Sequence, residues 1–193
     1  LTHPSVPART LQEFIDYARA NPGKLNYATG NTSGIVMTAM LASQANMQLV
    51  HIPYKSEPPA ITDLLSGTVQ VMISSYATVA PHLREGKLRA LVTTLPSRSP
   101  LMPDVPSIVE AGFPKFTVSP WAGVFGPARM PKEITERLNR ELNTLLARAD
   151  VRENLLKQAF GPKGGTPEEF AAFTRDQYQI WGKAIRDAGI QPE

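Results

Sequence analysis

The first half of the chain alternates helical and strand patterns, and this alternation constrains the fold more than any other feature. Apolar residues recur at helical spacing from Thr10 to the "NPG" at 21–23, and the strand pattern "LNYA" (25–28) follows at once. The alternation of helix and strand continues, with helices expected at 33–44, 56–67 and 78–85, and with strands expected at 48–54, 68–75 and 87–94. Such a succession is typical of an α/β layered domain with a mainly parallel sheet.

The pattern changes after residue 94. The stretch "LPSRSPLMPDVPS" (95–107) contains four prolines, so it predicts a crossing segment with a restricted backbone. Beyond it we expect a short helix around "IVEAGF", a strand-like stretch at 116–127, and helices at 131–148, 151–160 and 166–189. The chain therefore divides into an α/β part (1–94), a crossing segment (95–118) and a helical part (119–193).

Several helices carry clear local signals. Thr10 with Glu13 forms a T-x-x-E capping box at the first helix, and Thr166 with Glu169 forms another at the last one. In the helix expected at 131–148, apolar residues recur on one face at steps of three or four. They are Ile134, Leu138, Leu142 and Leu145.

Composition excludes several classes of function. The 193 residues include no cysteine, which excludes disulfides, thiol catalysis and cysteine-ligated zinc. The net charge is +3 and no run of Lys and Arg is present, so nucleic acid is not expected as a partner. No segment approaches the ~20 apolar residues that span a bilayer. The opening "LTHPSVPARTLQEF" lacks the basic region and apolar stretch of a signal peptide.

The residues that catalysis requires do not come together in the sequence. The three histidines have no partner at metal-ligand spacing, so no metal site is expected. His51 lies inside an apolar strand pattern, which favours a hydrogen-bonded core histidine over a general base. The "GNTSG" at 30–34 does not match the G-x-S-x-G nucleophile elbow, and it lacks the lysine of a P-loop. We therefore expect a protein that is not an enzyme and that needs no cofactor.

Small and hydroxylated residues gather where the first strand passes into the next helix. The first N–H groups of a helix have no intrahelical partner, and the helix dipole places partial positive charge there. Together these features hold carboxylates or phosphates at helix N-termini. The loop by itself leaves open the alternative of an N-cap and a turn without a ligand. The candidate contacts are Thr29, Gly30, Asn31, Thr32 and Ser33.

Two further loops are expected beside this one. The loop after the second strand offers Tyr54 and Lys55, and the loop after the third offers Ser74 and Ser75. Ligands of open α/β sheets bind outside the carboxyl ends of the strands, so the three loops predict one pocket. The alternative for Lys55 is a solvated surface charge.

Longer motifs resemble a known family. They are "VPARTLQEFIDYARANPGKLNYATGN", "VHIPYKSEPPAITDLLSGTVQVMI", "APHLREGKLRALVTT", "RSPLMPDVPSIVEAGFP" and "GGTPEEFAAF" with "WGKAIRDAGI". In this order, and over essentially the whole chain, they are similar to the extracytoplasmic solute receptors of tripartite tricarboxylate transporters, the TctC or Bug family.

The resemblance implies a periplasmic binding protein of the type 2 class, with two lobes of mainly parallel sheets and flanking helices. It implies a periplasmic receptor that captures a small carboxylate and delivers it to membrane permease subunits. Residues 1–94 would form the second lobe, and residues 119–193 the C-terminal part of the first. The family's carboxylate-binding loops fall on Gly30, Asn31, Thr32, Ser33, Ser74 and Ser75.

The sequence departs from the family pattern in several places. Family receptors begin with a further N-terminal segment, so the first lobe would be incomplete here and its open sheet edge would favour self-association. Gly34 and Val36 stand where the first loop often has a serine and a histidine. Ser74 and Ser75 replace the usual Asp-Asn, and Ser56-Glu57 replace Gly-Gly. The loss of the acidic residue argues against an amino-acid ligand.

Two other classes of function remain as alternatives. The effector domain of a transcription regulator shares the two-lobed plan, but it would be joined to a helix-turn-helix, and no such motif is visible. An α/β hydrolase or transferase would need an activated nucleophile, and the sequence shows no base to activate one.

Overall fold

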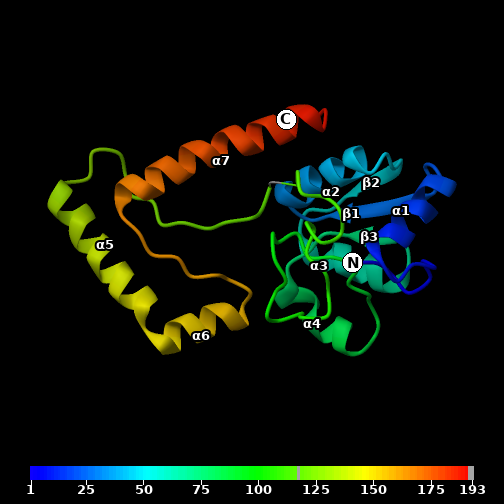
Figure 1. The fold of residues 1–193 in the computed structure, drawn as a ribbon, viewed down its shortest axis with the longest axis horizontal. Helices are drawn as coiled ribbons and strands as arrows, with labels where there is room; N and C mark the ends of the chain where they lie inside the picture. The colour runs from blue at the N-terminus through cyan, green and yellow to red at the C-terminus, as the bar shows by residue number, and fades with distance from the viewer. Residues whose placement is uncertain (117, 191–193) are drawn as a thin grey trace. The chain divides into compact units, whose positions relative to one another are not determined.

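The computed structural model describes residues 1–116 and 118–190 (Figure 1). The chain divides into two compact units, which we call unit 1 (Leu1–Ser119 with Gly182–Glu193) and unit 2 (Pro120–Trp181). Within the described residues, no helix has both the length and the apolar character needed to cross a membrane.

Unit 1 contains a parallel sheet of three strands in the order β2-β1-β3. The strands are β1 (Leu25–Thr29), β2 (Leu49–Pro53) and β3 (Val71–Met72). The helices that alternate with them are α1 (Leu11–Ala20), α2 (Thr32–Gln44), α3 (Glu57–Ser66) and α4 (Tyr76–Arg84). The predicted α/β domain with a parallel sheet is therefore confirmed.

The path of the chain places helices on both faces of this sheet. The chain passes from β1 out to β2 and then returns across β1 to β3. Right-handed crossovers in opposite directions put α2 and α3 on opposite faces, as Figure 1 shows. Leu64 and Met72 are fully buried where α3 packs on the sheet, and each such side chain stabilises the fold by about 1.5–3 kcal/mol.

Two predicted strands are shorter than expected. The strand predicted at 68–75 is reduced to Val71–Met72, and the segment 87–94 forms only isolated bridges. Thr2 lies between these two segments, with antiparallel bridges to both Val71 and Arg89. β3 pairs with β1 at Val71 and Met72, whereas the segment 87–94 makes single bridges at Arg89 and Thr93.

The two elements predicted between 108 and 127 are wrong for the residues that the structure describes. The segment "IVEAGF" forms turns rather than a helix, and it contains Gly112 at a left-handed φ of 93°. Residues 118–127 contain no strand, and Thr117 lies outside the described residues.

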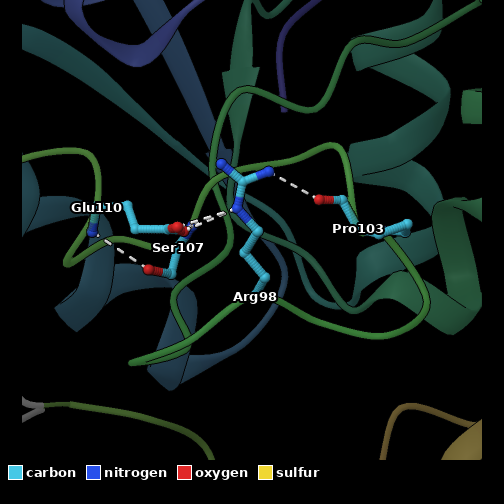
Figure 2. A network of polar contacts seen from close by, with 4 residues as sticks. All are labelled: Arg98, Pro103, Ser107 and Glu110. Carbon is cyan, nitrogen blue, oxygen red and sulfur yellow. Dashed lines mark hydrogen bonds and ion pairs between the residues drawn. The ribbon is translucent and has the colours of Figure 1, made fainter.

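The proline-rich crossing segment is folded by polar contacts of its own (Figure 2). Arg98 Nε donates to both carboxylate oxygens of Glu110, at 3.0 and 3.1 Å, and Nη1 donates to the Pro103 carbonyl at 2.8 Å. Ser107 N donates to Glu110 Oε2 at 2.8 Å, and Glu110 N donates to Ser107 Oγ at 3.2 Å. The Ser107 N–H and then the Arg98 guanidinium lower the pKa of Glu110.

Unit 2 contains α5 (Lys132–Ala147), α6 (Ala149–Lys157) and most of α7 (Pro167–Asp187). The predicted capping box of α7 is present, because Glu169 N donates to Thr166 Oγ1 at 3.1 Å and Thr166 N donates to Glu169 Oε2 at 2.8 Å. The helix predicted from the apolar periodicity of this segment is present as α5. Neither α5 nor α6, both of which the structure describes in full, has a buried residue.

Candidate ligand-binding site

Three loops follow the carboxyl ends of β1, β2 and β3. Since these strands are parallel and adjacent, the loops meet at one edge of the sheet. Glu57, the first residue of α3, links them. Its Oε1 accepts from Asn31 Nδ2 at 2.7 Å, and its Oε2 accepts from Ser74 Oγ at 2.9 Å. We call Asn31, Glu57 and Ser74 the loop cluster.

Thr29 is the last residue of β1, and its hydroxyl is bonded inside the sheet. Thr29 is 2% exposed, and its Oγ1 lies 2.6 Å from His51 Nε2. The ring of Tyr27 stacks on His51 with 4.7 Å between the centroids. Burial lowers the pKa of His51, so the neutral imidazole is favoured. The predicted hydrogen bond of His51 is confirmed, but His51 is half-buried on β2 and is not the core histidine that was predicted.

Gly30 brings the first two loops into backbone contact. A Cβ atom at this position would lie 2.4 Å from Glu57 N and 2.4 Å from the Ser56 carbonyl carbon. Its small size is therefore required by the neighbouring loop itself, in addition to any role in admitting a ligand. The same contact fixes the start of α3 beside the start of α2.

The N-terminus of α2 is only partly capped by side chains. Asn31 is the N-cap residue, and its Oδ1 accepts from Gly34 N at 2.7 Å. Thr32 is exposed and Ser33 is half-buried. Among the described residues, the N–H groups of Thr32 and Ser33 have no hydrogen-bond partner. Two donors at the positive end of the helix dipole are thus open to an anion.

Ser75 and Thr78 extend the loop cluster along the start of α4. The two hydroxyl groups are hydrogen-bonded to each other, and Thr78 Oγ1 also donates to Glu57 Oε2 at 3.3 Å. Sequence reasoning did not identify Glu57 or Thr78 as members of the site. The available signal was an acidic residue in the first turn of a helix, a position where the helix dipole favours negative charge.

Tyr54 and Lys55 are not joined to the loop cluster. The Tyr54 hydroxyl donates to Asp63 Oδ2 on α3 at 2.6 Å. Burial, followed by the hydrogen bond and charge of Asp63, raises the pKa of Tyr54 to about 12. Lys55 is exposed, and it makes no ion pair within the part of the chain that the structure describes.

The structure therefore joins Asn31, Ser74 and Ser75 of the nine predicted residues through Glu57 and Thr78. In the same described part, no three His, Asp or Glu side chains gather as metal ligands. The chemistry available at the loop cluster is hydrogen bonding to an anion by open amides, next to a fixed carboxylate.

Comparison with known proteins identifies the family. The model of the tripartite tricarboxylate transporter family receptor, TctC, matches residues 1–190, and the chain belongs to this family. It is 39% identical over 180 residues to the UPF0065 protein in the tcbD-tcbE intergenic region of Pseudomonas sp. (strain P51). That match covers 92% of the chain but 54% of the relative, so the chain spans about half the length of the protein that it matches.

Solved structures share the fold. The R. palustris protein Rpa4515, solved with adipate, is 28% identical, with a TM-score of 0.90, and the match covers 100% of this chain and 65% of that one. The periplasmic binding protein BugD is 26% identical, with a TM-score of 0.85, and the match covers 100% of this chain and 66% of that one. The chain therefore has the fold of TctC and Bug periplasmic binding proteins, as the sequence predicts.

Proposed function

We propose that this chain is the ligand-contacting part of an extracytoplasmic receptor that captures a small organic acid for a tripartite tricarboxylate transporter. The observation that carries the proposal is the pair of open N–H groups at Thr32 and Ser33, at the edge where three loops meet. Membership of the TctC receptor family and the adipate named with Rpa4515 support it. The partners are then a carboxylate and membrane permease subunits, and the location is the periplasm.

The family match favours this receptor over an effector domain of a regulator and over an α/β enzyme. The site captures its ligand without catalysis. The proposal keeps 1–94 as the second lobe, 95–118 as the crossing segment and 119–193 as the C-terminal part of the first lobe. The start of unit 2 at Pro120 supports a boundary near residue 119, whereas Gly182–Glu193 group with unit 1.

The substitution Ser33→Asp tests the proposal. An aspartate in the first turn of α2 is favourable for the helix, because its charge complements the dipole. The same charge occupies the open amides and repels an incoming carboxylate. We expect calorimetry on the full-length protein to show no measurable binding of an acid, such as adipate, that binds the unmodified protein.

The matched control is Ser33→Asn, which has nearly the same volume as the aspartate and no charge. We expect this variant to retain acid binding, and we expect thermal unfolding to show that both variants are folded. Unchanged affinity in the aspartate variant would contradict the proposed site.

A further inference from the structure

A stretch of unit 2, residues 120–126, has backbone groups without backbone partners. Within the described residues, no N–H or C=O group of this stretch takes part in a backbone–backbone hydrogen bond. Figure 1 shows the stretch as part of the long coil that leads into α5. The sequence predicts a strand over residues 116–127, and a strand requires a neighbouring strand with which its backbone groups can pair.

The side chains of this stretch alternate as they do in a strand. Trp121 and Phe125 contact Phe170 of α7, with 6.0 and 5.1 Å between the ring centroids. Gly123 lies between them, and a Cβ atom there would lie 2.2 Å from Phe170 Cζ. Every second residue therefore faces α7. Val124, which falls between two of them, is 69% exposed. The stretch thus has the side-chain pattern of a strand that is packed on α7 by one face.

Nothing in the sequence of this stretch opposes pairing with another strand. Residues 121–126, "WAGVFG", contain no charge and no proline, and Pro120 and Pro127 bound them. The N–H and C=O groups of a strand point to both of its sides, and neither side has a backbone partner within the described residues. The stretch therefore has two open edges, and two neighbouring strands are needed to cover them.

We propose that residues 121–126 form a central strand of a sheet in the full-length receptor, and that its two neighbours come from the part of the receptor outside these 193 residues. This inference rests on the proposed function, in which the chain is one part of a longer receptor. The match to Rpa4515 covers 65% of that chain, so about a third of it lies outside the match. A segment of that length is enough for several strands of the usual five or six residues.

A second copy of the chain is the alternative neighbour. A two-fold contact pairs a strand with its own copy along one edge, and the other edge stays open in both copies. Strands from the outside part of the receptor can cover both edges at once. The two open edges therefore favour the outside part over a second copy.

Hydrogen exchange followed by mass spectrometry tests the proposal on the full-length receptor and on the 193-residue chain. We expect the amides of residues 121–126 to exchange at least about a hundredfold more slowly in the full-length receptor, because pairing protects them there. The amides of β1 pair with β2 and β3 within this chain, so they are the internal control, and we expect them to be protected in both proteins.

The variant Val124→Pro removes one N–H group from the middle of the stretch. With neighbours on both sides this N–H group is paired, so we expect the unfolding temperature of the full-length receptor to fall by about 5 °C. The matched control is the same substitution in the 193-residue chain. There the N–H group has no backbone partner among the described residues, so we expect the unfolding temperature to stay the same.

Rapid exchange of residues 121–126 in the full-length receptor would overturn the proposal. Slow exchange in the 193-residue chain that is lost on dilution would assign the neighbour to a second copy, and it would overturn the proposal as well. If the full-length Val124→Pro variant fails to fold, exchange in the unmodified receptor decides. Acid binding to the full-length protein tests the proposed function separately, so binding together with rapid exchange would refute this inference alone.

Discussion

Gly30 shows, at the scale of single residues, how tightly the loops after the strands constrain one another. In Gly30→Ala the new Cβ would lie 2.4 Å from two backbone atoms of the next loop, and backbone cannot rotate away as a side chain can. We expect the variant to lose about 1–3 kcal/mol of unfolding free energy, as overpacked sites do. Urea denaturation followed by circular dichroism measures this loss.

The control for this prediction lies four residues further along the chain. A Cβ at Gly34 meets its nearest atom, Asn31 Oδ1, at 3.4 Å, which is ordinary contact. Because alanine suits a helix better than glycine, we expect Gly34→Ala to be neutral or more stable by up to about 1 kcal/mol. Equal stability of the Gly30→Ala variant and the unmodified protein would show that the two loops separate freely.

The residues of the candidate site could be predicted only where local pattern decides their place. The "TGNTSG" loop identifies the start of α2, and the structure places the N-cap at Asn31 within it. The orientation of Thr29 toward His51 and of Tyr54 toward Asp63 depends on packing between elements, which a local pattern does not contain. Glu57 was missed for the same reason, because its partners lie 17 to 26 residues away in the chain.

At the scale of elements, the N-terminus of α1 tests a local signal: Thr10 caps the helix as predicted, whereas Glu13 accepts from Arg9 N rather than from Thr10 N as in a full capping box. Thr10 Oγ1 accepts from Glu13 N at 3.1 Å, and the Glu13 carboxylate accepts from Arg9 N at 2.6 Å. We expect Thr10→Ala to lower the unfolding free energy by about 1 kcal/mol, because the Glu13 N–H loses its acceptor. Chemical denaturation followed by circular dichroism measures the difference.

Thr62→Ala is the control, because this exposed threonine lies inside α3 and its hydroxyl donates to a carbonyl of its own helix, that of Pro58. Alanine has the higher helix propensity, so we expect no loss of stability there. If both variants had the same stability as the unmodified protein, the cap of α1 would contribute nothing measurable.

The helices could be predicted more fully than the strands. Helix periodicity, caps and terminal glycines are local, and they predict α1 to α7 with shifts of a few residues at the ends. A strand also requires a partner. Val71 and Arg89 pair with Thr2, far from both in sequence, so strand patterns at 68–75 and 87–94 could not show how short the pairing would be.

At the scale of the whole molecule, apolar surface is concentrated in unit 2. Val124 and Phe125 are 69% and 64% exposed. Ile134, Leu138 and Leu145, on the apolar face of α5, are 49%, 47% and 42% exposed. Four aromatic rings of unit 2 contact one another without becoming buried, namely Trp121, Phe125, Phe170 and Phe173. Large exposed apolar side chains gathered in this way are typical of an interface.

We therefore expect the 193-residue chain to self-associate through α5, whereas the sequence by itself favours an open sheet edge as the contact. Sedimentation velocity should show a mass that rises with concentration. Leu138→Lys should weaken the association at least tenfold, because a charge in an apolar contact is costly to bury. Ala147→Lys places the same charge on the opposite face of the helix, so it should leave the association intact. A compact monomer at high concentration, or equal weakening by both lysines, would show that the apolar face of α5 is not the contact.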